Sequence, residues 1–348
     1  MSIVSETRVF DEIVSTSLDL YRNKMEEQIF KENATLWALR RAGCYQPADG
    51  GVQIIEPLMY GDNETVASYS GYDTLDLTPQ EGISATLWPW CQVAGSVVID
   101  GMSEFKNAGK SQLVNLVAAK VMQLEMSFQA KFTYYMYRAG KYSASQATKD
   151  PAGLLSMVAE VPDNYDVGGI DTSVYTWWQN KVLGNGNTAF TWVDGAALST
   201  GVTAMDTLYN NCTKKTGGSP NIGIASQALF QNYTGYLRTK QSLNALTDEQ
   251  AVAAGFTNVK FRGMTLFWDE DFGTASCTVP GTTSALIYLN SKFIRIRYAS
   301  SVNMKRTAWV TPQNQDARSC LILWYGNTTV SKRCKHGVLV DANVTNVV

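Results

Sequence analysis

The sequence predicts an α+β fold, in which helices are interspersed along the chain and strands gather toward its end. Three observations support this prediction. Apolar residues recur at helical spacing over residues 110–140, residues alternate from Ile83 to Val93, and short apolar runs follow one another after residue 259. With 348 residues and 45% apolar side chains, the chain can form two or three domains with a sizeable core.

Charge and hydropathy argue against two broad classes of protein. The net charge is −2 and the pI is about 5.6, which argues against nucleic-acid binding as the main activity. No run of about 18 apolar residues occurs, so the sequence predicts no membrane span. The N-terminus carries charges where a secretion signal needs an apolar core.

Residues that carry chemistry are sparse. His336 is the only histidine, so sites that need several histidines are excluded, and none of the six cysteines forms a CxxC pair. No phosphate-binding or nucleophile motif is present, and the sequence predicts no catalytic, cofactor or metal site. Two weaker alternatives are a cation site at Asp269-Glu270-Asp271 and a hydrolase that uses Glu270 and Asp271 as paired carboxylates.

Two segments of opposite charge lie far apart in the sequence. From Ala42 to Phe105 there are nine carboxylates and no lysine or arginine, whereas from Lys292 to His336 there are nine basic residues and one acid, Asp316. The two segments can pair within one molecule, each can be a solvated face, or one copy of the chain can bind another through them. Complementary charge of this kind sets the register of an association more than its affinity.

The first element is an amphipathic helix over residues 5–31, which Ser5 or Thr7 can cap. A short second turn begins at Asn33 and ends at residues 40–43. Next, apolar runs at residues 54–60 and 66–69 and the alternating run at 83–93 predict a long two-stranded hairpin with a polar tip at residues 72–82. Such a hairpin is marginal alone and needs a surface to lie on.

In the alternating run, Ile83, Ala85, Leu87, Cys91 and Val93 share one face, and Ser84, Thr86, Trp88, Trp90 and Gln92 share the other.

The strongest helix prediction covers residues 110–140, which would span about 46 Å if unbroken. Residues 153–183 are mixed, with a turn at Gly168-Gly169, and a second helix is expected at 196–211. Residues 220–237 read as a strand followed by a helix that Ser226 caps. Further strands are predicted at residues 259–268, 285–289, 293–298 and 319–325.

This order of elements resembles the major capsid proteins of tailed bacteriophages, which have the Hong Kong 97-type fold. Specific strings add to the resemblance over about residues 51–325. They are Ile55-Glu56-Pro57-Leu58-Met59-Tyr60-Gly61, Tyr69-Ser70-Gly71-Tyr72, Val98-Ile99-Asp100-Gly101, Asn107-Ala108-Gly109, Gly168-Gly169-Ile170-Asp171, Trp177-Trp178, Gly255-Phe256 and Tyr288-Leu289-Asn290-Ser291-Lys292. Each string is weak alone, and their common order is the more specific signal.

The resemblance implies a domain plan and a function. The plan is an N-terminal helical arm (1–50), an extended loop in the form of a hairpin (51–98), a peripheral domain with a spine helix at 110–140 (99–193), an axial domain (194–289) and a return to the peripheral domain (290–348). The function it implies is that of a major capsid protein, which assembles into pentamers and hexamers and forms an icosahedral shell around packaged double-stranded DNA. The chain would not be an enzyme.

The resemblance also gives the charged segments a role. The acidic hairpin of one subunit would lie on a basic peripheral-domain surface of the next. On the hairpin, the residues expected at this contact are Asp73, Asp76, Glu81, Trp88 and Trp90. On the basic side they are Arg295, Arg297, Lys305, Arg306, Lys332 and Arg333.

Further partners follow from the same resemblance. The extended loop contains no lysine, so the isopeptide bond that some members form is excluded. We expect a separate scaffolding protein, a portal, a decoration protein, weak nonspecific contact with the packaged DNA, no membrane, assembly in the host cytoplasm and a final place in the virion. The alternative is an aromatic-rich viral module that binds a receptor or glycan through Trp88, Trp90, Trp177 and Trp178.

Overall fold

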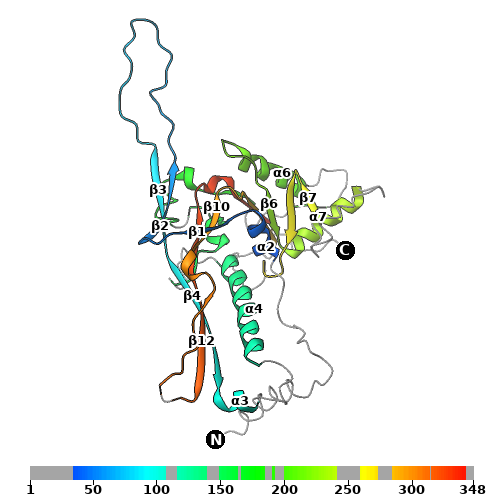
Figure 1. The fold of residues 1–348 in the computed structure, drawn as a ribbon. Coiled ribbons are helices and arrows are strands. Elements are labelled where there is room, and N and C mark those ends of the chain that lie inside the picture. Colours follow the sequence, from blue (N-terminus) through cyan, green and yellow to red (C-terminus); the bar gives the residue numbers. More distant parts are fainter. Residues whose placement is uncertain are drawn as a thin grey trace. The chain divides into compact units, whose positions relative to one another are not determined.

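The structure is a computed structural model. It describes residues 34–106, 116–138, 149–163, 166–184, 190–192, 200–240, 259–272, 284–313 and 315–341. These residues form two compact units (Figure 1). The first unit contains the described residues of 92–132 and 301–325, and the second contains the described residues of 34–91, 133–300 and 326–341.

The first unit is a narrow sheet covered by a long helix. Strand β4 (Cys91–Asp100) and the two-residue strand β11 (Lys305–Arg306) both pair with β12 (Ala317–Val330). Helix α4 (Leu116–Tyr137) packs on this sheet, where Phe132 contacts Trp324 edge to face with ring centroids 4.6 Å apart. A short helix, α3 (Gly101–Lys106), follows β4, and a one-turn helix, η4 (Ser300–Val302), precedes β11.

The second unit is built on a six-stranded sheet. In spatial order its strands are β5 (Lys181–Leu183), β13 (Gly337–Asp341), β9 (Ser284–Leu289), β6 (Ile222–Ala225), β8 (Met264–Trp268) and β7 (Val259–Phe261). Helices α6 (Thr200–Thr213) and α7 (Gln227–Lys240) bury Leu208 and Leu229 against the sheet residues Leu286 and Leu339. The central strands β13, β9 and β6 are buried and largely apolar on both faces, as central strands are.

Three more strands of the second unit support a projecting hairpin. Strand β1 (Tyr45–Ala48) pairs in parallel with β10 (Ile294–Ala299), and β10 pairs in antiparallel with the last part of β12. Strands β2 (Gln53–Met59) and β3 (Ile83–Pro89) form a separate antiparallel hairpin, which projects from this unit (Figure 1). The short helices are α2 (Ala34–Arg41), α5 (Leu154–Met157), η3 (Thr176–Trp178) and η5 (Arg333–Lys335).

Most predicted elements are confirmed where the structure describes them. The long helix is present as α4, the short turn before residue 43 is α2, and Gly168 and Gly169 form a turn with φ of +66° and +78°. The helix predicted at residues 5–31, the first residues of the one predicted at 110–140, and residues 196–199 lie outside the described residues.

Three predictions were wrong in detail. The single strand predicted at residues 259–268 is a hairpin, because Arg262 and Gly263 take positive φ and turn the chain between β7 and β8. Residues 66–69 are not a strand, so the paired part of the long hairpin ends at Met59 and Ile83. Ser226 precedes α7 as predicted, but its hydroxyl oxygen accepts a hydrogen bond from Ala285 N of β9 rather than one from the helix.

The only histidine is buried in the second unit. Its Nδ1 atom accepts a hydrogen bond from the Asn290 backbone N–H at 3.2 Å, and no described residue bonds to its Nε2 atom. Burial, together with the charge of Arg333, lowers the pKa of His336 to about 3. Protonation of Nδ1 would both remove this hydrogen bond and place a second buried charge beside Arg333.

This environment predicts that mild acid destabilises the second unit. The folded pKa of His336 lies below the unfolded value of about 6.5, so its contribution to stability is complete above pH 6.5 and is lost as the pH falls toward 3. We expect a loss of about 2 kcal/mol between pH 7 and pH 5. Denaturant unfolding at both pH values measures it.

His336→Gln is the control, because a glutamine carbonyl can accept the bond from Asn290 and does not titrate. Its stability should change little between pH 7 and pH 5. An equal pH dependence in both proteins would contradict the assignment.

Candidate functional site

The hairpin β2–β3 is the feature with the clearest division of faces. Because neighbouring residues of a strand point to opposite sides, each strand contributes alternate residues to each face. In β2 the burial alternates without exception, and Ile54, Glu56 and Leu58 are buried while the residues between them are exposed. In β3 the cross-strand partners of Ile54 and Glu56, which are Trp88 and Thr86, are buried as well.

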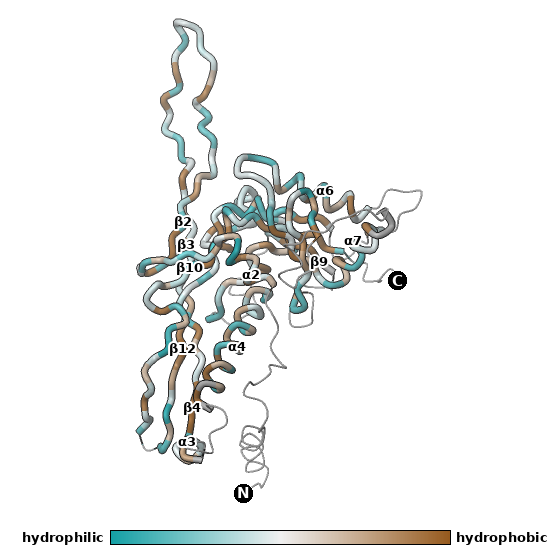
Figure 2. Tube along the Cα trace, turned by 45° about the vertical axis from the view of Figure 1, so that its right-hand side comes forward, coloured by the Kyte–Doolittle hydropathy of each residue, from teal (hydrophilic) through white to brown (hydrophobic). Residues whose placement is uncertain are grey.

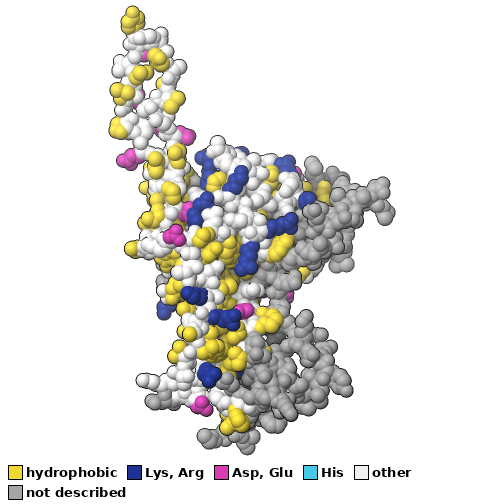
Figure 3. Space-filling model, viewed as in Figure 1, with side chains coloured by type: hydrophobic (Ala, Val, Ile, Leu, Met, Phe, Trp, Pro, Cys, Tyr) yellow, Lys and Arg dark blue, Asp and Glu magenta, His cyan; other side chains and the backbone are white. Residues whose placement is uncertain are grey.

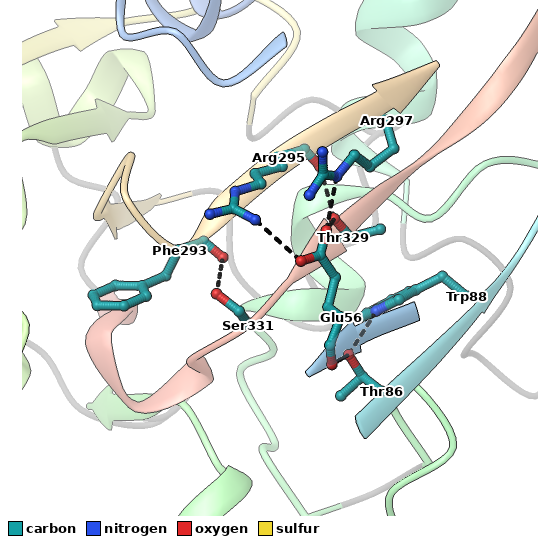
Figure 4. A network of polar contacts seen from close by, with 8 residues as sticks. All are labelled: Glu56, Thr86, Trp88, Phe293, Arg295, Arg297, Thr329 and Ser331. Atoms are coloured by element: carbon teal, nitrogen blue, oxygen red, sulfur yellow. Dashed lines mark hydrogen bonds and ion pairs between the residues drawn. The ribbon is translucent and has the colours of Figure 1, made fainter. Parts of the chain in front are cut away.

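The inward face is tied to the second unit by one buried carboxylate. Glu56 Oε2 lies 3.1 Å from Arg295 Nη1, and Glu56 Oε1 lies 2.8 Å from Arg297 Nε (Figure 4). The hydroxyl of Thr329 donates to Oε1 at 3.3 Å. The Glu56 side chain is 4% exposed, so the carboxylate is removed from water and held by two cations.

The strand geometry of β10 and β12 explains why these three partners converge. Arg295 and Arg297 are two residues apart on β10, so their side chains lie on the same face. Thr329 is the cross-strand partner of Arg295 in β12. A buried ion pair of this kind adds little net stability, but loss of one member is costly because a buried charge is left unpaired. We infer that Glu56 fixes how the hairpin lies on the sheet.

A second attachment uses the glycine turn of residues 167–170. Leu87 N donates to Gly168 O at 2.9 Å, and the Trp88 ring lies against Gly168. A Cβ atom at Gly168 would approach Thr86 Cβ to 3.0 Å and Trp88 Cζ2 to 3.1 Å. Gly168 therefore serves both the positive φ of the turn and the close approach of β3. Farther out, the rings of Tyr60 and Trp177 stack at 4.9 Å.

Beyond the paired strands, residues 60–82 form an exposed acidic tip. The chain closes at its base, where Tyr60 N donates to Gly82 O at 2.9 Å. Asp73 accepts a hydrogen bond from Ser70 N, and Asp76 accepts bonds from both Thr78 N and the Thr78 hydroxyl. These bonds from Thr78 lower the pKa of Asp76. The tip carries five acidic residues and no basic one.

The outward face of the hairpin is apolar. Three cross-strand pairs line it, Ile55 with Leu87, Pro57 with Ala85, and Met59 with Ile83. Of these side chains, Met59 is 78% exposed and Ile83 76% exposed. Hydrophobic positions continue along the tip (Figure 2), where the exposed residues are Val66, Tyr69, Tyr72, Leu75 and Leu77. A strand that leaves a largely apolar face exposed while its buried face contains a glutamate departs from the usual pattern for a monomeric protein.

The structure separates the predicted contact residues into two groups. Asp73, Asp76 and Glu81 are exposed on the tip, and Lys305 and Arg306 are exposed in the first unit. Their contact with another subunit stays a prediction.

The others are already engaged within the chain. Arg295 and Arg297 hold Glu56, so the acidic and basic segments meet here inside one molecule. Lys332 Nζ donates to Thr216 O, and Trp90 Nε1 donates to Gly51 O.

Two predicted contact residues are corrected by their burial. Trp88 has no exposed surface and donates its indole N–H to Thr86. Arg333 is 1% exposed and donates to Met157 O and to Asn180 Oδ1. Neither side chain can reach a neighbouring subunit while the second unit keeps this fold. We therefore remove both from the proposed contact.

The sequence analysis missed the roles of Glu56 and of the outward apolar face. Apolar residues occupy both faces of β2, with Ile54 and Leu58 on one side and Ile55 and Met59 on the other. The alternation alone therefore does not say which face is buried. The available signal was the single carboxylate inside an apolar strand, which needs a partner wherever it is buried.

The described residues offer no cluster that could hold a metal ion. No group of three or more His, Cys, Asp and Glu side chains lies together among them. Asp269, from the acidic triplet, accepts hydrogen bonds from the hydroxyls of Thr35 and Tyr137 and thereby joins α2, α4 and the end of β8. Among the described helices, none is long and apolar enough to cross a membrane.

Comparison with solved structures shows the fold. The chain is similar to the cyanophage A-1(L) capsid asymmetric unit, with a TM-score of 0.63 and 12% sequence identity over 93% of this chain and 98% of that chain. It is also similar to the capsid of the Myoviridae phage XM1, with a TM-score of 0.58 and 12% identity over 93% and 97%. A third match is a holo-SrpI encapsulin complex from Synechococcus elongatus, with a TM-score of 0.53 and 12% identity over 96% of both chains.

These matches cover nearly the whole length of each chain, so the predicted α+β fold of the Hong Kong 97 type is confirmed. No protein-family model matches the sequence, and no curated protein is similar to it.

The Glu56 contacts predict a specific loosening of the hairpin. In Glu56→Gln the amide cannot balance Arg295 and Arg297, so we expect the free energy of unfolding to fall by about 1–3 kcal/mol. Amide hydrogen exchange at residues 53–59 and 83–89 should become faster. Glu81→Gln is the matched control, because Glu81 is exposed on the tip, and it should change stability by less than about 0.5 kcal/mol. Equal effects of both substitutions would contradict the anchoring role.

Proposed function

We propose that the chain is a shell-forming structural protein, the major capsid protein of a tailed bacteriophage. The observation that supports this best is the exposed apolar face of a hairpin whose other face is fixed to its own subunit. In an isolated subunit this face meets water. Contact with another copy would remove it from water, and the fold is one from which capsids of two phages in the comparison are built.

The gain from covering this face is large enough to drive an association. Ile55, Met59, Ile83 and Leu87 are 61%, 78%, 76% and 43% exposed. Full burial of each such side chain contributes about 1.5–3 kcal/mol, so the four together offer roughly 4–8 kcal/mol per hairpin before the cost of association. The acidic residues of the tip would then select the register of the contact.

The geometry of the contact is that of a ring. A projecting hairpin that lies on a different surface of the next subunit makes a head-to-tail contact, which closes into rings when the rotation fits. We propose pentamers and hexamers of this kind, which enclose packaged double-stranded DNA in an icosahedral shell in the virion. A separate scaffolding protein, a portal and possible decoration proteins complete the proposed assembly, which takes place in the host cytoplasm. We propose no catalytic activity.

Negative-stain electron microscopy of the purified chain, expressed alone and with a coexpressed scaffold, tests the proposal. Closed shells, or sheets of five- and six-membered rings, are expected. Uniform small particles in both preparations at high concentration would contradict it and would favour a receptor- or glycan-binding module.

A paired substitution tests the apolar face without breaking the hairpin. Ile55 and Leu87 are direct cross-strand partners, so Ile55→Lys with Leu87→Glu places opposite charges side by side and keeps the two strands paired. We expect a folded subunit with an unchanged melting temperature that forms no shells. The matched control is Val174→Lys with Val161→Glu, at two exposed apolar positions outside the hairpin. Shell formation by the hairpin variant would refute this contact.

The charge of the tip has its own test. Reversal of Asp73, Asp76 and Glu81 to lysine should leave the subunit folded and impair shell assembly. High salt should not restore assembly. Because Asp73 and Asp76 also stabilise local turns, a second variant with Asp73→Asn and Asp76→Asn keeps a side-chain oxygen as acceptor and removes only the charge. If the lysine variant forms normal shells, electrostatic selection at the tip is excluded.

A further inference from the structure

A loop after helix α6 surrounds the ammonium group of a buried lysine. We call residues 213–219 the lysine-backed loop. Lys335 Nζ donates hydrogen bonds to the carbonyl oxygens of Lys215 at 2.8 Å, Lys214 at 2.9 Å, Thr213 at 3.0 Å and Gly218 at 3.3 Å. The Thr213 carbonyl belongs to the last turn of α6 and has no partner inside the helix. The ammonium thus closes the helix end and shapes the loop.

Two further carbonyls of this loop are occupied as well. Thr216 O accepts a hydrogen bond from Lys332 Nζ at 2.7 Å, and Gly217 O accepts one from Asn290 Nδ2 at 3.3 Å. Six consecutive carbonyl groups, from residue 213 to residue 218, are therefore turned toward side chains of the same unit. Positive φ at Lys215, Gly217 and Gly218 makes this path possible.

The peptide N–H groups of the loop point the other way. In a trans peptide the N–H of each residue is directed opposite to the C=O of the preceding residue, and the described chain has no cis peptide. The N–H groups of residues 215–219 consequently face away from the buried Lys335. Within the described part of the chain they donate no hydrogen bond. N–H groups carry partial positive charge, so donors that have no acceptor in the chain and face outward attract anions.

Lysine side chains surround this surface. Lys214 and Lys215 are exposed on the loop itself, and Lys292 Nζ lies 3.8 Å from the position a Cβ atom would take on Gly218. The ion pairs found among the described residues include none of these lysines, nor Lys332 or Lys335. Basic side chains gather on the face of the second unit seen in Figure 3, where few acidic ones are visible. Within the part of the chain that the structure describes, these ammonium groups therefore have no carboxylate partner.

The composition of this surface distinguishes nucleic acid from a protein partner. A protein interface has an apolar core, whereas nucleic-acid interfaces are more polar and strongly positive. Among the described residues of 176–267 and 269–308, none is an exposed large hydrophobic side chain. The acidic hairpin tip, by contrast, carries several, such as Tyr69 and Leu77, and needs an apolar surface opposite it.

We propose that the lysine-backed loop, together with Lys292 and Lys332, binds the phosphate groups of a nucleic-acid backbone. The outward N–H groups and the exposed ammonium groups contact the phosphate oxygens, and Lys335 adds a fixed positive charge behind the loop. The contact reads no base sequence. It is a property of the single subunit and does not depend on shell formation.

The test measures binding of a fluorescein-labelled 20-base-pair duplex to the purified full chain by fluorescence anisotropy over a series of salt concentrations. The variant is Lys215→Asn with Lys292→Gln, where asparagine suits the positive φ at residue 215. We expect an affinity about tenfold lower and a salt slope smaller by about 2, because two phosphate contacts are lost. The control is Lys305→Gln with Arg306→Gln, which removes the same charge from an exposed site in the first unit and should leave binding unchanged.

Several results would overturn the proposal. They are an equal loss of affinity in both variants, no loss in either, or no binding of the duplex by the wild-type chain. Binding of inorganic polyphosphate without binding of the duplex would assign the loop to free phosphates instead. Displacement of the duplex by a peptide of residues 60–82 would assign it to the hairpin tip of a second copy. Equal melting temperatures of both variants and the wild type exclude unfolding as the cause.

Discussion

The buried carboxylate of Glu56, held by Arg295 and Arg297, is the constraint on which the exposed surface of the hairpin depends. Once Glu56 faces inward, the two-residue period of the strand places Ile55 and Met59 outward. A one-residue shift would bury those apolar side chains and expose the carboxylate, but it would leave two arginines on β10 without a partner. The buried carboxylate therefore decides which of the two apolar faces of β2, the one with Ile55 and Met59, the subunit presents to its surroundings.

The acidic and basic segments of this chain each divide into residues that bind within the subunit and residues that stay exposed, where they can contact other molecules. The acidic segment splits between Glu56, which is buried at the hairpin base, and the tip carboxylates, which stay in water. The basic segment splits in a similar way. Arg333 and Lys335 are buried and donate hydrogen bonds to carbonyl and amide oxygens, whereas Lys305 and Arg306 are exposed. Net charge along the sequence did not distinguish these cases. Only the position of each residue on its strand or turn does.

The type of an element could be predicted from the sequence wherever one local signal dominated. Examples are the apolar residues at helical spacing that include Phe128 and Phe132, and the Gly168-Gly169 pair that marks a turn. The fold followed from the order of these elements, and it is shared with capsid structures at 12% identity, where few individual residues are retained. Orientation could not be predicted. Trp88 looked like a contact residue because neither face of its strand carries charged side chains that would identify the solvent-exposed face. In addition, the strand is interrupted at Trp90, which shifts the alternation, so that both Trp88 and Cys91 are buried.

The way the lysine-backed loop is built has a consequence for how the chain can change over evolutionary time. Each of the six carbonyl groups from residue 213 to residue 218 has an assigned donor. Insertion or deletion of one residue would turn several of them away from Lys335, Lys332 or Asn290 and leave acceptors unsatisfied. The span from Tyr60 to Gly82 is held mainly by short local turns and can absorb such changes at little cost. Among natural variants of this chain, length should vary in the hairpin tip and stay constant between α6 and β6.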